Sequence, residues 1–421
     1  MKRAALGIIA IALMNAQPSQ DPADLLEQMR DKVVARLPTA GYACVATINR
    51  SYFSRPRPPV TQRSCEQIAG DRKRNRDKVQ LDKTDRLRLK VVMTSGREIY
   101  SWAWPGAYSR SVNDILQSGP IGTGALGSHL HEIFGNPLVR FRLLDENEKN
   151  LSFGFRVPVE ASTYLIWARS QWRAAGYVGS LEIDLAAPEL KQLTIESDEL
   201  PPETTMCEAS TTLDYPSGGA GVLLPSKART RYLIRDTTET EWDTAFSDCR
   251  DSTSEKVQEG PRRTLFPPTW AVPFKLALTA PIETSTAAAG DVIKARLAEP
   301  MLGPSREVLA PAGAIFTGRI MRLEHHLDRK GLPIAYMDKA ALTGRRFFLI
   351  WVDFDAIEVN GVVSSIRARL TCDHPGPRCF TANMSDQIWD RAFIFPTDDP
   401  NFIVPAGYES SWLTGFALPK E

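Results

Sequence analysis

Long stretches of this chain alternate between apolar and polar residues, and this period of two is the feature that most constrains the fold. The alternation runs through 86–91, 139–143, 181–185 and 192–196. Successive side chains of a strand point to opposite faces of a sheet, so such runs are typical of antiparallel strands that have one face on a core and one in solvent. The sequence therefore predicts a mainly β protein.

Helical spacing is confined to two segments. Asp21 followed by Pro22 is a helix start signal, and large apolar residues then recur every fourth position as far as Leu37. This helix should end before Pro38, because the residue before a proline disfavours helical backbone. We expect a second, short helix over 124–134, so the fold class is α+β with few helices.

A polar segment rich in proline divides the chain. Residues 259–273 carry four prolines among polar side chains and interrupt the strand pattern, which is typical of a linker. We place one domain at 22–258 and a second at 274–421.

The second domain should contain strands alone. Runs of strand character include 347–359 and 362–370, and Asn360-Gly361 between them is a strong signal for a two-residue hairpin turn. Regularly spaced strands of this kind predict an all-β barrel or sandwich.

The first sixteen residues have the layout of a secretory signal peptide. Lys2 and Arg3 precede an apolar stretch over 4–14, and Asn15-Ala16 could supply the cleavage site. A helix of this length is too short to cross a hydrocarbon core of about 30 Å. We therefore expect a cleaved signal at 1–16, a periplasmic or secreted protein, and no integral membrane segment.

The six cysteines suit an exported chain, in which an even number predicts disulfide bonds. Neighbours in sequence form three couples, and we favour the sequential pairing over the other connectivities that the sequence leaves open. No Cys-x-x-Cys pair occurs, so structural zinc is not expected. The favoured pairs are Cys44 with Cys65, Cys207 with Cys249, and Cys372 with Cys379.

The charges argue against a nucleic-acid partner. The chain has 51 basic and 50 acidic side chains, which nearly cancel. Basic residues concentrate between Asp71 and Lys90, but no aromatic side chains lie among them to stack on bases. We expect this run to be a solvated loop and hairpin.

Residues 122–127 match the dinucleotide-binding pattern Gly-x-Gly-x-x-Gly, but the context does not fit. That pattern needs an apolar strand immediately before it, and 113–120 is polar and contains a proline. We interpret the glycines as a flexible entry to a helix, with a mobile gate over a cavity as the alternative. No nucleotide cofactor is expected.

Two histidine clusters invite a metal without supplying its geometry. His129 and His131 point about 200° apart on an ideal helix, so surface or capping roles are expected for them. His325-His326 is expected to begin a polar loop.

The carboxylates at 353 and 355 fall on the outward face of a predicted strand, which alternation alone explains. Neither Gly-x-Ser-x-Gly nor Ser-x-x-Lys occurs. We assign no catalytic residue, metal or cofactor and expect no enzyme.

The order of elements in the first domain is similar to that of the outer-membrane lipoprotein carrier family. An amphipathic helix directly follows the signal, strands succeed it, and Gly179 to Asp184 leads into Lys191 to Ile195 like that family's glycine-strand-Asp hairpin. The likeness covers Ala23 to about Cys249. It implies a strongly curved antiparallel sheet with a hydrophobic concave face that helices close.

The second domain has a weaker likeness to the β-domain of conjugal-transfer channel proteins. It rests on 289–297, 308–313 and 317–320, where strands turn through glycine and proline. This likeness implies a fold and no chemistry.

Aromatic residues give the candidate ligand-binding site. In a curved sheet they fill the core, or they line an apolar pocket for a lipid or other hydrophobic ligand if the concave face is open. The candidates are Tyr100, Trp102, Trp104, Tyr108 and Trp167.

Three functional hypotheses follow. The first is a non-catalytic exported protein that binds a hydrophobic ligand or a cell-envelope component. The second is a structural or assembly module that binds envelope proteins. The third, which has the least support, is a hydrolase whose residues converge from distant positions.

Overall fold

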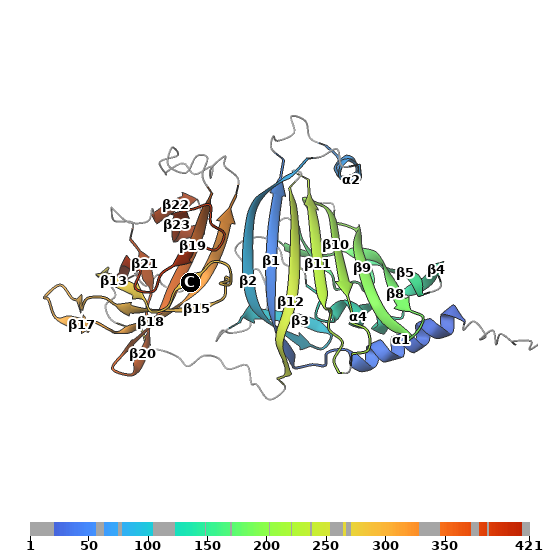
Figure 1. The fold of residues 1–421 in the computed structure, drawn as a ribbon, viewed down its shortest axis with the longest axis horizontal. Coiled ribbons are helices and arrows are strands. Elements are labelled where there is room, and N and C mark those ends of the chain that lie inside the picture. The colour runs from blue at the N-terminus through green and yellow to red at the C-terminus, as the bar shows by residue number, and fades with distance from the viewer. Residues whose placement is uncertain are drawn as a thin grey trace, which may run out of the picture.

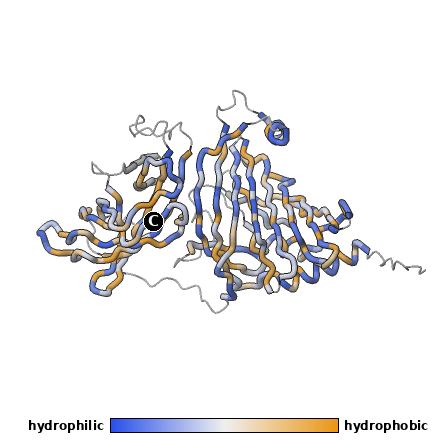
Figure 2. Tube along the Cα trace, in the orientation of Figure 1, coloured by the Kyte–Doolittle hydropathy of each residue, from blue (hydrophilic) through white to orange (hydrophobic). Residues whose placement is uncertain are grey.

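Antiparallel strands dominate the structure, as the alternation predicts. Figure 2 shows hydrophobic and hydrophilic residues alternating along most of them. In this computed structural model the described residues are 21–55, 63–74, 78–103, 123–147, 149–168, 171–201, 203–219, 221–235, 238–252, 264–266, 271–327, 346–371, 379–384 and 387–414. The expected signal peptide, Trp104, Tyr108 and Cys372 lie outside these ranges.

The first part of the chain forms one large, open antiparallel sheet (Figure 1). Its strands follow the order β3-β2-β1-β12-β11-β10-β9-β8-β5-β4. A separate hairpin joins β6 (Leu165–Ala168) to β7 (Gln171–Ala174). The bounds of the sheet strands are β1 Tyr42–Ser54, β2 Gln80–Thr94, β3 Arg97–Trp102, β4 Arg140–Glu146, β5 Asn150–Val157, β8 Gly176–Asp184, β9 Glu189–Glu199, β10 Met206–Asp214, β11 Lys227–Ile234 and β12 Glu239–Asp251.

Helix α1 (Pro22–Arg36) confirms the first helix prediction. The Asp21 side chain accepts a hydrogen bond of 2.9 Å from the Ala23 amide, which satisfies one of the free amides at the helix start. Leu25, Met29 and Val33 are buried against the sheet, while the remaining face is polar. The helix lies along the lower ends of the strands in Figure 1.

The described residues of this part contain three further short helical segments. They are α2 (Cys65–Lys73), α4 (Ser128–Gly135) and the 3-10 turn η1 (Val159–Ala161). The second expected helix therefore begins four residues later than the sequence indicates, because 124–127 form a turn. The inner side chains of α1 and α4 belong to one hydrophobic core with those of the sheet.

The later part of the chain is built from strands alone in its described residues, as predicted. Its main sheet follows the order β21-β25-β13-β15-β18-β19-β23-β22 and surrounds a second hydrophobic core. The strands are β13 Pro273–Leu278, β14 Ile282–Glu283, β15 Val292–Leu297, β16 Met301–Leu302, β17 Val308–Ala310, β18 Ile315–His326, β19 Phe347–Val359, β20 Val362–Ser365, β21 Ala368–Leu370, β22 Cys379–Met384, β23 Gln387–Pro396, β24 Ile403–Val404 and β25 Glu409–Thr414.

The hairpin between β19 and β20 confirms the turn prediction. Val359 pairs with Val362, so the loop has two residues. Asn360 and Gly361 have φ angles of 52° and 78°, both in the left-handed region that these two residue types tolerate.

Strand β2 joins the two parts into one hydrogen-bonded sheet. Along one edge it pairs with β1, and along the other it pairs first with β18 and then with β3. Between those two, the Arg88 amide donates to the Ala289 carbonyl at 2.7 Å, and the Ala289 amide donates to the Arg86 carbonyl at 2.8 Å. The predicted boundary at 259–273 is only partly described, and the division into domains stays a prediction.

The basic run from 71 to 90 is a junction, so the expectation of a solvated loop and hairpin is wrong for its second half. Lys83 forms an ion pair with Glu324 at 3.1 Å, and Arg88 forms one with Asp291. The Arg86 guanidinium donates to the Ser285 carbonyl at 2.5 Å. These cations therefore contact the later part of the chain.

The junction also explains one glycine. Gly290 has φ of 109°, and a Cβ there would lie 2.2 Å from the Arg88 carbonyl oxygen. Only glycine allows the two backbones to approach this closely.

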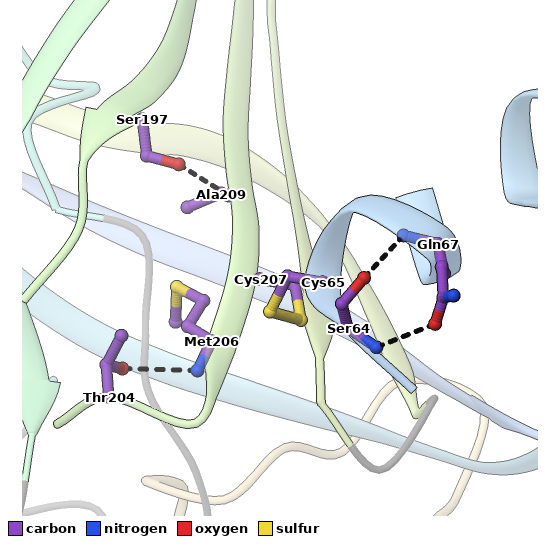
Figure 3. Close-up of a disulfide and its surroundings, with 8 residues drawn as sticks. All are labelled: Ser64, Cys65, Gln67, Ser197, Thr204, Met206, Cys207 and Ala209. Atoms are coloured by element: carbon purple, nitrogen blue, oxygen red, sulfur yellow. Dashed lines mark hydrogen bonds between the residues drawn. A yellow bond between two sulfur atoms is a disulfide. The ribbon is translucent and has the colours of Figure 1, made fainter. Parts of the chain in front are cut away.

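The disulfides pair differently from the sequential expectation, which is wrong for the four described cysteines. Cys44 bonds to Cys249, and Cys65 bonds to Cys207 (Figure 3). The first bond joins the neighbouring strands β1 and β12, and the second joins the start of α2 to β10. The expected Cys372–Cys379 bond involves residues outside the described side chains.

Candidate functional site

The inner face of the first sheet is lined with buried aromatic side chains. Tyr164, Tyr177, Tyr232 and Trp242 come from four different segments and are all buried. Their rings are in contact, with centroid separations of 5.9 Å for Tyr164 and Tyr177 and 4.6 Å for Tyr232 and Trp242. The expected hydrophobic inner face is therefore present, and its described side chains pack on one another.

Acidic side chains meet the phenol groups of this face. The Tyr177 hydroxyl donates to Glu132 at 2.6 Å, and the Tyr100 hydroxyl donates to Glu98 at 2.5 Å. Burial, and next the negative charge of Glu98, raise the pKa of Tyr100 well above its usual value. Burial raises the pKa of Tyr164 to about 12. These phenols are therefore neutral hydrogen-bond donors at physiological pH.

Three polar atoms of the inner face are buried without a hydrogen-bond partner in the described part of the chain. They are the Nε2 of His129, the hydroxyl of Tyr215 and the Nε1 of Trp242. Buried polar groups are nearly always satisfied, so such a set within an apolar interior calls for an explanation.

The glycine segment before α4 binds a carboxylate of the protein itself. Glu98 accepts hydrogen bonds from the amides of Gly124 at 2.7 Å, Gly127 at 3.2 Å and Ser128 at 3.4 Å. Amides at a helix start are a favourable environment for an anion. The Glu98 carboxylate thus occupies the position beside the described glycines where a bound phosphate would lie. This internal contact gives a structural reason for the Gly-x-Gly-x-x-Gly pattern.

His129 is a buried side chain, so the expected surface or capping role is wrong for it. The side chain is 3% exposed and contacts the rings of Tyr164 and Tyr177. Burial lowers the pKa of His129 to about 4, because the charged imidazolium would lose its hydration. His131 is only partly buried, and its Nε2 lies 3.0 Å from the Pro38 carbonyl oxygen.

We expect this buried imidazole to make stability depend on pH. Above pH 6.5 His129 is neutral in both the folded and the unfolded chain. Between pH 6.5 and about 4 only the unfolded chain takes up the proton. As the pH is lowered through this range, His129 should therefore reduce the free energy of unfolding by about 1.4 kcal/mol per pH unit. The measurement is an NMR titration of the imidazole signals, assigned with His129→Asn, beside denaturant unfolding at each pH. A His129 signal that titrates near 6.5 would contradict the assignment.

Of the five candidate aromatic residues, the structure describes the side chains of Tyr100 and Trp102, and both pack on the hydrophobic core of the first part. Tyr100 belongs to the buried inner face. Trp102 lies at the junction, where the Arg319 guanidinium is 5.6 Å from its ring centroid. Trp167 is in β6, with its side chain outside the described set, as are all of Trp104 and Tyr108. Ligand binding by these residues stays a prediction.

Other suggested clusters are separate from one another. Asp353 and Asp355 are exposed on β19, and Phe354 between them is buried, as alternation predicts. His325 and His326 end strand β18, so the expectation of a loop there is wrong. Among the described residues, no group of three His, Cys, Asp or Glu side chains could hold a metal ion.

The junction contains a buried ionic network that sequence reasoning missed. Arg50, whose side chain is 0% exposed, donates to both oxygens of Asp85 at 2.6 and 2.7 Å. The Tyr52 hydroxyl donates to the same carboxylate at 3.0 Å. Arg50 lies on the buried face of β1, at a position where alternation predicts an apolar residue.

Glu324 is the centre of a second set of charges. It contacts Lys83 at 3.1 Å, His326 at 2.9 Å and Arg322 at 3.0 Å. Burial alone would raise the pKa of Glu324, but the hydrogen bond from His326 and the charges of Lys83 and Arg322 hold it well below its usual value. The carboxylate therefore stays ionised at the junction.

Beside these ions lies a cleft of about 320 Å³. Its walls come from β1 and β2 on one side, and from β18, β19 and two loops of the later part on the other. Its surface combines hydroxyl, amide and guanidinium groups with apolar groups in similar proportion. The lining residues are Asn49, Arg50, Ser51, Thr84, Asp85, Arg86, Thr284, Ser285, Leu323, His325, Phe348, Pro400 and Asn401.

Comparison with known proteins gives one distant match. No protein-family model and no curated protein matches the chain. Among solved structures, a LolA superfamily protein from Nitrosomonas europaea is 8% identical, with a TM-score of 0.26; the match covers 54% of this chain and 92% of that one. A TM-score this low carries no argument, so the functional argument rests on the geometry above.

Two further findings concern the redox compartment of the protein and its relation to a membrane. Disulfide bonds persist in oxidising compartments, and this chain has two in its described part. None of the described helices is both long and apolar enough to cross a membrane. The likeness of the later part to channel proteins has no counterpart in the comparisons and stays a prediction.

Proposed function

We propose that this chain is an exported, non-catalytic binding protein that holds a hydrophobic ligand or an envelope component against the inner face of its first sheet. The observation that carries the proposal is the composition of that face. It combines a continuous aromatic and aliphatic surface with polar atoms of His129, Tyr215 and Trp242 that have no hydrogen-bond partner among the described residues. Binding sites for small molecules typically have this mixture of apolar lining and a few polar groups.

The covering helices define how a ligand would enter. The described inner side chains are packed together, so a ligand must displace part of the cover. Helix α1 covers the inner face through one side only, with Leu25, Met29 and Val33 buried among its fifteen residues. Outward movement of α1 would expose the inner face while leaving the sheet hydrogen bonds intact.

The test is native mass spectrometry of the processed protein purified from its own compartment, followed by organic extraction and lipid analysis. We expect a stoichiometric apolar adduct that organic solvent removes. A matched sample of Met29→Asp, which places a charge between α1 and the inner face, should lose the adduct. Clean apo protein at the mass of the disulfide-bonded chain would contradict ligand binding and favour the assembly-module hypothesis.

A further inference from the structure

The junction cleft has features of a ligand site that the inner face of the sheet does not share. Its volume of about 320 Å³ is at the lower end of the range of small-molecule pockets, roughly 300–1,000 Å³. It lies where two separately cored parts of the chain meet, which is a preferred place for ligand sites. Its rim residues Ser285, Pro400 and Asn401 are exposed, so the cleft opens to solvent.

The polar groups of this cleft differ in whether they already form hydrogen bonds within the protein. The carboxylate of Asp85 is fully engaged by Arg50 and Tyr52. By contrast, the side-chain hydroxyls of Ser51, Thr84 and Ser285 have no hydrogen bond to any other described residue. The same holds for the side-chain amide of Asn401, whose backbone amide donates to Asp399. These groups are available to a ligand rich in hydroxyl oxygens.

A buried histidine supplies an independent observation. His325 lines the cleft and is only 8% exposed, with its ring stacked on Phe348 at 4.2 Å between centroids. Its Nε2 is buried and has no hydrogen-bond partner among the described residues. An unsatisfied buried polar atom is costly, so this histidine beside the cleft calls for an explanation.

The charge of the lining selects for an acidic group. Arg50 and Asp85 neutralise each other. Arg86 is held by neutral oxygens alone: its Nε donates to Asn49 at 2.8 Å and its Nη1 to the carbonyls of Ser285 and Ala287. Its Nη2 donates to no other described residue and can bind a carboxylate. Asp291, whose negative charge also acts on Arg86, forms its ion pair with Arg88.

We propose that the junction cleft binds an acidic sugar, with the carboxylate on Arg86, the hydroxyls on the free rim groups and the C–H face of the ring on Leu323 and Phe348. This site goes beyond the proposed apolar function of the inner face, and either can be present without the other. Because the ligand would contact β1, β2 and β18 together, it would bind the junction in its assembled form.

The experiment is isothermal titration of the full-length processed protein with sodium D-glucuronate. Two comparison probes are D-glucose, which has hydroxyls but no carboxylate, and glutarate, which has carboxylates but no hydroxyls. We expect glucuronate to bind at one site, and both comparison probes to bind at least about tenfold more weakly. Arg86→Gln should weaken glucuronate binding about tenfold or more, whereas Arg88→Gln, on the same strand but outside the cleft, should leave it unchanged. Ser51→Leu, which fills the cleft, should abolish it.

Three outcomes would overturn the proposal. The first is no heat of binding with glucuronate at roughly 20 mM, which is far above the millimolar Kd of a weak site. The second is equal binding of all three probes. The third is an equal loss of glucuronate affinity with Arg86→Gln and Arg88→Gln. Thermal melting of each variant separates lost binding from lost folding. Organic extraction of apolar adducts tests the inner face independently, so failure of one proposal leaves the other standing.

Discussion

Replacing Asp85 with alanine should lower the free energy of unfolding by about 3–5 kcal/mol. The substitution removes both acceptors of the fully buried Arg50 guanidinium and the acceptor of Tyr52. The arginine then remains on the inner side of β1 without the carboxylate that binds both of its donating nitrogens. Chemical denaturation at pH 7 measures the loss.

Two variants control this prediction. Asp355→Ala removes a carboxylate from an exposed position on β19 and should change stability by less than about 0.5 kcal/mol. The double change Arg50→Met and Asp85→Leu removes both charges and should recover most of the loss. If Asp85→Ala were as stable as the parent protein, the buried ion pair would be refuted.

Removing the bond between Cys65 and Cys207 with the double change Cys65→Ala and Cys207→Ala should cost about 2–4 kcal/mol. The cysteines are 142 residues apart, so the bond restricts a long loop of the unfolded chain. It also ties α2 to β10, and without it this helix loses its cross-link to that strand. Thermal and denaturant unfolding under non-reducing conditions measure the effect.

The control for this variant is Ser64→Ala, which removes the capping box of α2 but leaves the bond. It should cost only about 1 kcal/mol. Peptide mapping of the unreduced protein should recover Cys65 linked to Cys207, and Cys44 linked to Cys249. Recovery of Cys44 linked to Cys65 would contradict the fold of the first sheet.

The sequence predicts the elements of this fold because their signals are local. The caps of α1, the alternation of β8 and β9, and the Asn360-Gly361 turn each depend on residues a few positions apart. Each was confirmed by the structure.

The disulfide pairing and the junction could not be predicted, because both depend on which strands become neighbours. Cys249 reaches Cys44 only because β12 returns to the edge of β1. Arg86 and Arg88 resemble the outward residues of a solvated strand until β18 and the segment around Ala289 cover that edge. Single-sequence patterns contain no information on such long-range contacts.

The candidate site was predicted only in part for the same reason. Tyr100 joins the inner face as expected, but its partners Tyr164, Tyr177 and Tyr232 come from distant strands and loops. At the junction, no local pattern predicts the burial of Arg50, and the His325-His326 pair gives no sign that His325 lines a cleft. Their role becomes visible once burial and hydrogen bonding are known.

The shared strand β2 has a consequence for the stability of any shortened form of this protein. Its backbone between Lys83 and Arg88 is hydrogen-bonded to β18 and to Ala289 along one edge. Cleavage within the segment that precedes Pro273 and loss of the later part would leave this edge unpaired. Unpaired strand edges are templates for intermolecular association. The later part thus covers this stretch of β2, which then cannot pair with a strand of another molecule.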